Sequence, residues 1–306
     1  MNWKALFADS SFFVKFILTV FFVIVGLLFS VVVTSVIFSW FGIPATGDIS
    51  FLLDNHIAAL KISQFLQSIC GFLLPAMIMA YLTSAQPLSF LSLQKTPGLK
   101  LTLITIVFML IAIPVINCLA ELNASVKFSE SLQWLEAWIK KHEDSRVLIT
   151  EKFLETSTIY GLLLNIFLIA VIPAISEEFF FRGLLQCYFA QWTKNKHIAI
   201  WLTAFIFSAI HIQFYGFVPR ILLGAYFGYL LVWSGSIWLP VIAHFVHNAT
   251  AIVLYFLWKN EYIGFNPEEF GIHGTFFVAC INAVLLVLMI YLTPKSPKGD
   301  FSEVSS

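Results

Sequence analysis

Charged residues are scarce in this chain of 306 residues, where Lys, Arg, Asp and Glu together make up 11%. A soluble globular domain has about a quarter of its residues charged, so the composition excludes an ordinary soluble protein. The 17 basic and 17 acidic residues cancel, and nothing marks a basic surface for nucleic acid. The four cysteines stand far apart in or beside apolar stretches, which gives neither a CxxC metal motif nor a disulfide framework.

Long apolar runs dominate what is present, since 59% of the residues are hydrophobic. A membrane-spanning helix needs about 20 largely apolar residues. Runs of this length without polar alternation are helices rather than barrel strands, because unpaired backbone groups cannot face lipid. The eight runs lie near 12–40, 63–83, 99–119, 159–181 or beyond, 198–212, 217–233, 237–258 and 275–292. The sequence therefore predicts an all-α, polytopic integral membrane helix bundle with about eight transmembrane helices.

The chain divides into four regions on this pattern. Residues 1–120 form an N-terminal membrane unit of three helices, and 121–157 an extramembrane loop. Residues 158–293 form a membrane core, and 294–306 a short polar tail that we expect to be disordered. The first run is too long for a signal peptide and is predicted to stay as an anchor. Lysines gather in the short loops on the side of the N-terminus, so the positive-inside rule predicts that both termini are cytoplasmic.

The extramembrane loop contains one amphipathic stretch, residues 131–140. Leu135 and Ile139 follow helical spacing there, with Trp134 and Trp138 beside them. Tryptophan on the apolar side of such a stretch is typical of a helix that lies in the membrane interface. The pattern predicts an interfacial helix, and the alternative is a solvated linker.

Only two acids occur between Thr158 and Trp258, and they are the neighbours Glu177 and Glu178. A carboxylate at bilayer depth costs at least about 2.5 kcal/mol, so the presence of two here indicates a functional or a structural role. Glu178 and Arg182 stand four residues apart on one helical face, where an ion pair neutralises both. Glu177 lies about 100° round the helix and is left available for chemistry. The structural alternative is an ion pair that holds helices together, with Glu177 reaching to the interface.

Two later runs add side chains that can act on a water molecule. His211 ends the fifth run, and His244 and Asn248 share a face of the seventh at i,i+4 spacing. His247 either flanks the same site or is a hydrogen-bonded core residue. A single histidine in an apolar helix is more often a core residue, but here three share a segment with the only acids of the core. Carboxylate, imidazole and amide groups together indicate a hydrolytic site.

Motifs of other intramembrane hydrolases are missing: the chain has no HExxH, no GxSxG and no GxGD. Gly224 and Gly228 form a GxxxG-like pair that either mediates dimerisation or packs helices within the bundle, and packing is the preferred interpretation. Arg220, beside Pro219 at a helix start, is predicted to extend its side chain to the membrane interface.

The polar residues resemble a known family in their order and spacing. Glu177-Glu178-xxx-Arg182, Phe207-xxx-His211 and His244-xxx-Asn248 look like the three motifs of the CPBP family, the CAAX-protease and bacteriocin-processing intramembrane proteases, also called Abi proteins. The resemblance covers about residues 159–255. It implies that Glu177 is the general base on a water that His211 positions, and that His244 and Asn248 stabilise the oxyanion. Glu178, Arg182 and His247 are then supporting residues.

The resemblance also implies a cofactor, because the family is described as metal-dependent, commonly with zinc. Glu177, His211 and His244 would be the metal ligands, and three such ligands with a water suit zinc. Asn248 is a poor zinc ligand and is kept as a hydrogen-bond donor. The metal itself, zinc or another divalent ion, stays a hypothesis at this stage.

The sequence thus predicts an intramembrane endopeptidase that cleaves a membrane-tethered peptide or protein, in a lipid bilayer that we take to be a bacterial inner membrane. The first alternative is a non-catalytic protein of the same fold that binds a partner, as an immunity protein or a scaffold. The second is a proton-coupled transporter, against which the chain shows no inverted repeat. The sequence does not determine the oligomeric state.

Overall fold

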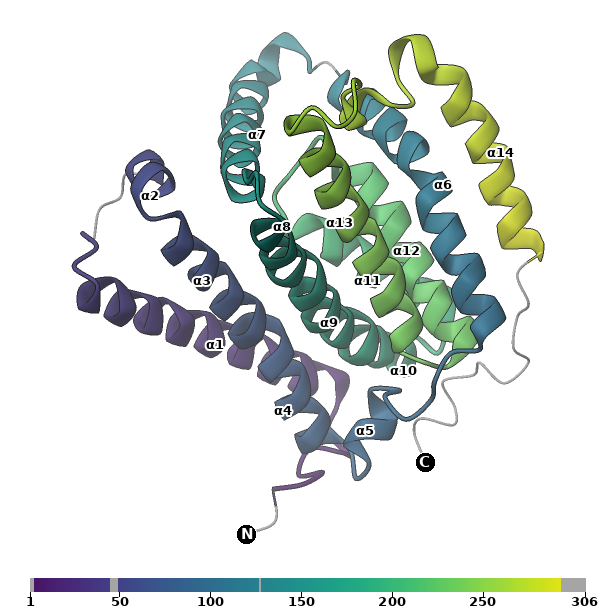
Figure 1. Ribbon diagram of the computed structural model, residues 1–306. Helices are drawn as coiled ribbons and strands as arrows, with labels where there is room; N and C mark the ends of the chain where they lie inside the picture. The colour runs from purple at the N-terminus through teal and green to yellow at the C-terminus, as the bar shows by residue number, and fades with distance from the viewer. Residues whose placement is uncertain (1–2, 45–48, 127, 293–306) are drawn as a thin grey trace.

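The computed structural model describes residues 3–44, 49–126 and 128–292, and these residues form helices and connecting segments without a strand. The helices pack into one bundle (Figure 1). The prediction of an all-α, polytopic membrane bundle is confirmed. The predicted polar tail, 294–306, lies outside the described residues.

Each of the eight apolar runs is helical, but the runs differ in length. Six helices of the described residues are long and apolar enough to cross a membrane, namely Phe12–Trp40, Ile57–Thr83, Leu99–Ala124, Ile159–Thr193, Phe217–Ser234 and Trp238–Lys259. The other two runs form the shorter apolar helices Lys196–Ala209 and Phe276–Tyr291. That these two helices also span the membrane, which would give the predicted total of eight, stays a prediction.

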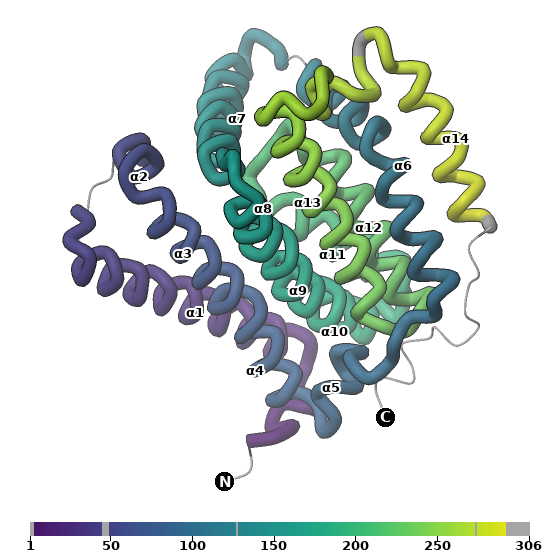
Figure 2. Tube along the Cα trace, viewed as in Figure 1, coloured from purple at the N-terminus to yellow at the C-terminus, as the bar shows by residue number. Residues whose placement is uncertain are grey.

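The N-terminal helices stand together on one side of the bundle (Figure 2). They are α1 (Phe12–Trp40), α2 (Ile49–Asn55), α3 (Ile57–Ser68), the π-helical η1 (Ile69–Leu73), α4 (Leu74–Thr83) and the short α5 (Pro87–Phe90). The fully buried residues of α1 are the small polar Thr19 and Ser30, while many of its large apolar side chains are exposed. This arrangement is typical of a helix that faces lipid and packs through small residues.

A helix outside the apolar runs covers one end of the bundle. After α6 (Leu99–Ala124) and the 3₁₀ turn η2 (Glu130–Leu132), α7 runs from Gln133 to Leu154. The predicted segment is therefore helical, and the helix continues 14 residues beyond the predicted end at Lys140. Trp134 and Trp138 are exposed on it, and its place in the membrane interface stays a prediction.

The fourth run is one helix of 35 residues, Ile159–Thr193. It comprises α8 (Ile159–Asn165), the π-helical η3 (Ile166–Val171), α9 (Ile172–Glu178), the π-helical η4 (Phe179–Leu185) and α10 (Gln186–Thr193). As predicted, it continues past Arg182. Two π-helical stretches flank α9, and π-helical turns often accompany functional sites.

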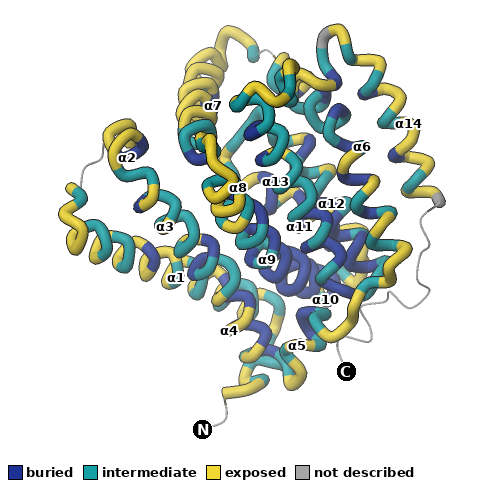
Figure 3. The backbone as a smooth tube through the Cα atoms, viewed as in Figure 1, coloured by how far each residue is buried: buried dark blue, intermediate teal, exposed yellow. Residues whose placement is uncertain are grey.

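The remaining helices surround this long helix. They are α11 (Lys196–Ala209), α12 (Phe217–Ser234), α13 (Trp238–Lys259), the 3₁₀ turns η5 (Pro267–Glu269) and η6 (His273–Thr275), and α14 (Phe276–Leu292). Helix α14 runs antiparallel to α6 at the edge of the bundle (Figure 1), where Asn282 Nδ2 donates to the Ile111 carbonyl at 3.1 Å. Burial is concentrated in α9 to α13 (Figure 3). The polar residues predicted for the site lie in this buried part.

Gly224 and Gly228 bring α12 close to its neighbours inside the bundle. A Cβ atom at Gly224 would lie 3.2 Å from Ala204 of α11. The backbone carbonyls of both glycines accept side-chain donors of the long helix. Arg182 Nη2 donates to the Gly224 carbonyl and Gln186 Nε2 to the Gly228 carbonyl, both at 3.2 Å. The glycine pair therefore packs helices within the bundle, as the preferred interpretation predicted.

Gly228→Ala is expected to destabilise the fold by about 1–3 kcal/mol. The new Cβ would lie 2.6 Å from Gln186 Oε1 and 2.9 Å from Ile200 Cγ2, and both side chains are fully buried and cannot move aside. Gly264→Ala is the matched control, because no atom lies within 4 Å of the added methyl group there. Denaturant titration of the purified variants in detergent measures the difference, and equal stability of the two would contradict the packing account.

Candidate active site

A buried network links three of the predicted residues. Glu178 Oε1 accepts a hydrogen bond from Arg182 Nη1 and another from His244 Nδ1, each at 2.8 Å. Glu178 and Arg182 are fully buried, and His244 is 6% exposed. The predicted i,i+4 ion pair is therefore present, and it also joins the long helix to α13. Because Nδ1 of His244 is held by the carboxylate, its Nε2 atom is the nitrogen left for chemistry.

Two phenylalanines enclose this network. The Arg182 guanidinium lies 4.4 Å from the ring centroid of Phe207 and 5.4 Å from that of Phe227, so aromatic faces share its charge with Glu178. Phe227 stacks on the His244 imidazole with centroids 5.4 Å apart. The apolar walls keep the ion pair dry and hold the imidazole in one orientation.

His211 follows the last turn of α11, beside Phe207. Its Nδ1–H donates to the Phe207 carbonyl at 2.6 Å, and the two rings meet edge to face at 5.0 Å. This bond leaves Nε2 as an acceptor. The motif Phe207-xxx-His211 thus has a structural meaning, since one phenylalanine covers Arg182 and also fixes the tautomer of His211.

Glu177 is half-buried, and no hydrogen-bond partner of its carboxylate is found in the part of the chain that the structure describes. Its charge lies within electrostatic range of His244, Arg182 and Arg220. His211 is in turn within range of His244 and Arg220. The predicted residues therefore surround one region, but Glu177, His211 and His244 do not hydrogen-bond to one another among the described residues.

Asn248 has a backbone partner that explains its position. Proline lacks an N–H group, so Pro173 deprives the Ile169 carbonyl of the donor that an α-helix supplies four residues on. Asn248 Nδ2 donates to this carbonyl at 3.2 Å. One amide N–H of Asn248 is thus engaged with the long helix, and the second remains for a ligand.

His247 faces a different space from His244. It lines a cavity of about 190 Å³ with residues of α6, α7, α13 and the segment around Glu268. Its Nδ1 atom is buried and makes no hydrogen bond to any residue that the structure describes. The sequence left two interpretations of His247 open, a residue that flanks the site and a hydrogen-bonded core residue. The Nδ1 atom does not fit the second interpretation, because it makes no hydrogen bond among the described residues.

The predicted metal ligands do not form a metal-binding group. Among the residues that the structure describes, no three His, Cys, Asp or Glu side chains are arranged to hold a metal ion. One oxygen of Glu178, Oε1, is bonded to both Arg182 and His244, and the charge of a second guanidinium, that of Arg220, acts on Glu177. This donor set does not fit zinc.

Arg220 is the residue that the sequence interpretation misplaced. Its side chain does not extend to the interface but turns inward, where Nη2 donates to Gln213 Oε1 at 2.6 Å and Nη1 is buried. Only the fold shows this, because α11, α12 and the segment between them place Arg220 facing the long helix.

Helix α7 holds the segment that follows His211. The buried Glu143 accepts a hydrogen bond from the Tyr215 backbone N–H at 3.1 Å. Burial and the Glu143 carboxylate raise the pKa of the Tyr215 phenol, which stays neutral near pH 7. Helix α7 thus fixes the loop that carries His211 and Gln213.

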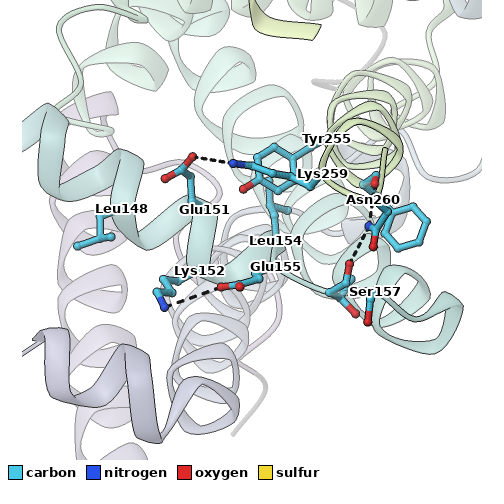
Figure 4. Close-up of a pocket in the computed structure, with 11 residues that line it drawn as sticks. Leu148, Glu151, Lys152, Leu154, Glu155, Ser157, Tyr255, Lys259 and Asn260 are labelled. Atoms are coloured by element: carbon cyan, nitrogen blue, oxygen red, sulfur yellow. Dashed lines mark hydrogen bonds and ion pairs between the residues drawn. The ribbon is translucent and has the colours of Figure 1, made fainter. Parts of the chain in front are cut away.

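A separate cavity of about 490 Å³ lies between the ends of α7 and α13 (Figure 4). Glu151 pairs with Lys259 across it at 3.6 Å, and Lys152 pairs with Glu155 at 3.8 Å. It contains none of the predicted site residues.

The comparison with protein families supports the sequence resemblance. A family model described as "Type II CAAX prenyl endopeptidase Rce1-like" matches residues 159–250, which hold all seven predicted site residues. The match covers less than a third of the chain and extends from α8 into α13. It supports the suspected resemblance of this segment to the CPBP family.

A curated relative is the uncharacterized protein YpbD of Bacillus subtilis (strain 168), which is 28% identical over 89 residues. The match covers 28% of this chain and 42% of that protein, so the chain spans less than half the length of the relative. No solved structure matches the chain.

Proposed function

We propose that the chain is an intramembrane endopeptidase of the CAAX type that hydrolyses a peptide bond in a membrane-tethered peptide or protein. The observation that carries the proposal is the contrast between two adjacent glutamates. Glu178 is fully buried and its Oε1 atom is held by Arg182 and His244, whereas Glu177 is partly exposed and has no hydrogen-bond partner within the described ranges. A half-buried carboxylate without a partner is available to take a proton from water.

The hydrolysis begins with a water molecule between Glu177 and His211. Glu177 takes one proton, and His211 Nε2 accepts the other O–H and orients the water, because its Nδ1–H is held by the Phe207 carbonyl. The water oxygen attacks the peptide carbonyl carbon, and Glu177 passes its proton to the leaving nitrogen as the C–N bond breaks. An environment without bulk water strengthens each of these electrostatic effects.

His244 and Asn248 act on the carbonyl side of the reaction. The Glu178 carboxylate holds His244 Nδ1 and stabilises a positive charge on the imidazole, so that a protonated Nε2 donates to the oxyanion. The second amide N–H of Asn248 is a further donor. Phosphate transfer, redox chemistry and nucleic-acid binding find no support in the residues of this site.

The test is cleavage of a panel of membrane-tethered peptides, prenylated CAAX tails among them, by the purified chain in liposomes. His244→Gln is expected to lower kcat about 10²- to 10⁴-fold with the fold retained. His142→Gln is the matched control, because this histidine lies exposed on α7. Cleavage by the His244 variant at the native rate would contradict the mechanism.

The same assay tests the metal hypothesis and the alternatives. Cleavage is expected to survive a chelator, because the donors do not form a metal group. A loss that Zn²⁺ reverses would restore Glu177, His211 and His244 as ligands. Absence of cleavage with every peptide would favour the partner-binding protein, and substrate-dependent proton flux the transporter. Cytoplasmic termini and a bacterial inner membrane stay predictions.

A further inference from the structure

Arg220 occupies a fixed position in the first turn of α12. Its Nη2 donates to Gln213 Oε1 at 2.6 Å, and its guanidinium lies over Gly216. A Cβ atom at Gly216 would lie 2.8 Å from Nη2, so the glycine leaves room for the planar group. These contacts hold the cation in place before any ligand arrives.

The other terminal nitrogen, Nη1, has no partner. It is buried and makes no hydrogen bond among the described residues. A buried donor without a partner costs about 1–3 kcal/mol, and more when it is charged. Such a group in a native protein needs an explanation, and a ligand that brings an acceptor oxygen supplies one.

Arg220 lies near residues that the proposed reaction uses. Its charge lies within range of Glu177 on α9, His211 after α11, His247 on α13 and Glu143 on α7. The proposed base and the residue proposed to orient the water are thus both near this cation. Two other donors of the site each have one N–H in use, since Asn248 binds the Ile169 carbonyl and His244 Nδ1 binds Glu178, whereas Arg220 Nη1 is wholly unengaged among the described residues.

Charge balance favours a carbonyl oxygen as the ligand. When Glu177 takes a proton from water and the water oxygen attacks, the carbonyl π pair moves to oxygen, so one negative charge passes from Glu177 to the substrate. A cation near both positions stabilises the charge before and after this step. A substrate carboxylate would instead add a negative charge beside Glu177 and Glu178.

We propose that Arg220 is a further catalytic residue, whose Nη1–H donates to the carbonyl oxygen of the scissile bond and stabilises the oxyanion that forms there. This role rests on the proposed peptidase function. On collapse of the tetrahedral species the electron pair returns to the carbonyl, the C–N bond breaks, and the nitrogen takes the proton held by Glu177. Arg220 keeps its own protons throughout.

The test compares Arg220→Gln and Arg220→Lys with the native chain in liposomes. Arg220→Gln is expected to lower kcat about 10²- to 10³-fold with KM changed less than about threefold. Arg220→Lys, which keeps the charge without the planar geometry, is expected to recover part of this loss. Lys140→Gln is the control, because this lysine is an exposed cation of α7 and is expected to behave as the native chain.

Binding of a phosphinic peptide of the substrate sequence gives a readout without turnover, since its tetrahedral anion imitates the oxyanion. Arg220→Gln is expected to weaken it by about the factor lost in kcat. If the native chain cleaves the peptide and Arg220→Gln has the same kcat, the role of Arg220 is overturned, but the peptidase function is not. Equal phosphinic peptide binding by both chains, with no cleavage by either, would overturn the peptidase as well.

Pairs of peptides that differ only in a free or an amidated C-terminus distinguish two possible ligands of the Arg220 guanidinium. These are the scissile carbonyl oxygen and the terminal carboxylate of the substrate. An effect of Arg220→Gln that is equal for both peptides supports the scissile carbonyl. An effect confined to the free acid, and seen in KM, would overturn the proposal in favour of a terminal carboxylate.

Discussion

Glu177→Gln is expected to lower kcat about 10²- to 10⁴-fold while the protein keeps its native stability. The amide cannot take a proton from water, but it fills the same space. No hydrogen bond of Glu177 exists to be lost within the described part of the chain, so the fold has no reason to weaken. Liposome cleavage rates and denaturant titration in detergent measure the two quantities on the same preparations.

Two other glutamates provide the comparison. Glu178→Gln removes the charge that Arg182 and His244 both contact, and is expected to lower stability as well as activity. Glu136→Gln changes an exposed residue of α7 and is expected to leave both unchanged. If Glu177→Gln cleaves at the native rate, the base is a different group.

Arg182→Met is expected to destabilise the protein by about 3–5 kcal/mol, because it leaves the buried Glu178 carboxylate without its cation. The side chain is fully buried, pairs with Glu178 at 2.8 Å and donates to the Gly224 carbonyl. This single substitution removes both the ion pair with Glu178 and the hydrogen bond to the Gly224 carbonyl. Denaturant titration of the purified variant measures the loss.

The double variant Glu178→Gln/Arg182→Met shows whether charge is the cause. With both charges removed, most of the stability is expected to return, while a glutamine at 178 still accepts from His244. Cleavage is expected to stay low, because the neutral amide stabilises a charged imidazole poorly. A double variant as unstable as Arg182→Met would show that packing, and not charge, holds these helices together.

Spacing along single helices predicted a large part of the structure. The eight apolar runs are all helical, and the Glu178–Arg182 pair forms because residues four apart share a helix face. The same rule would have found Gln186, one further turn on, which binds the Gly228 carbonyl. These features are local, so the sequence contains enough to find them.

Contacts between distant segments escaped the sequence. Nothing near Arg220 in the chain indicates that its guanidinium turns toward Glu177, since this depends on how α12 packs on the long helix. Asn248 donates to the Ile169 carbonyl in place of the N–H group that Pro173 lacks. The donor and the acceptor of this hydrogen bond are 79 positions apart along the chain. Glu143 holds the loop of His211 from a helix that the sequence predicted only in its first turns.

The central claim is that this bundle hydrolyses a peptide bond with a water molecule activated at Glu177. The most direct measurement is mass spectrometry of peptide products formed in H₂¹⁸O by the native chain and by Glu177→Gln. We predict that the native chain gives a product whose new carboxyl terminus carries one ¹⁸O, and that the variant gives almost none. Product without label, or equal labelled product from the variant, would contradict the account.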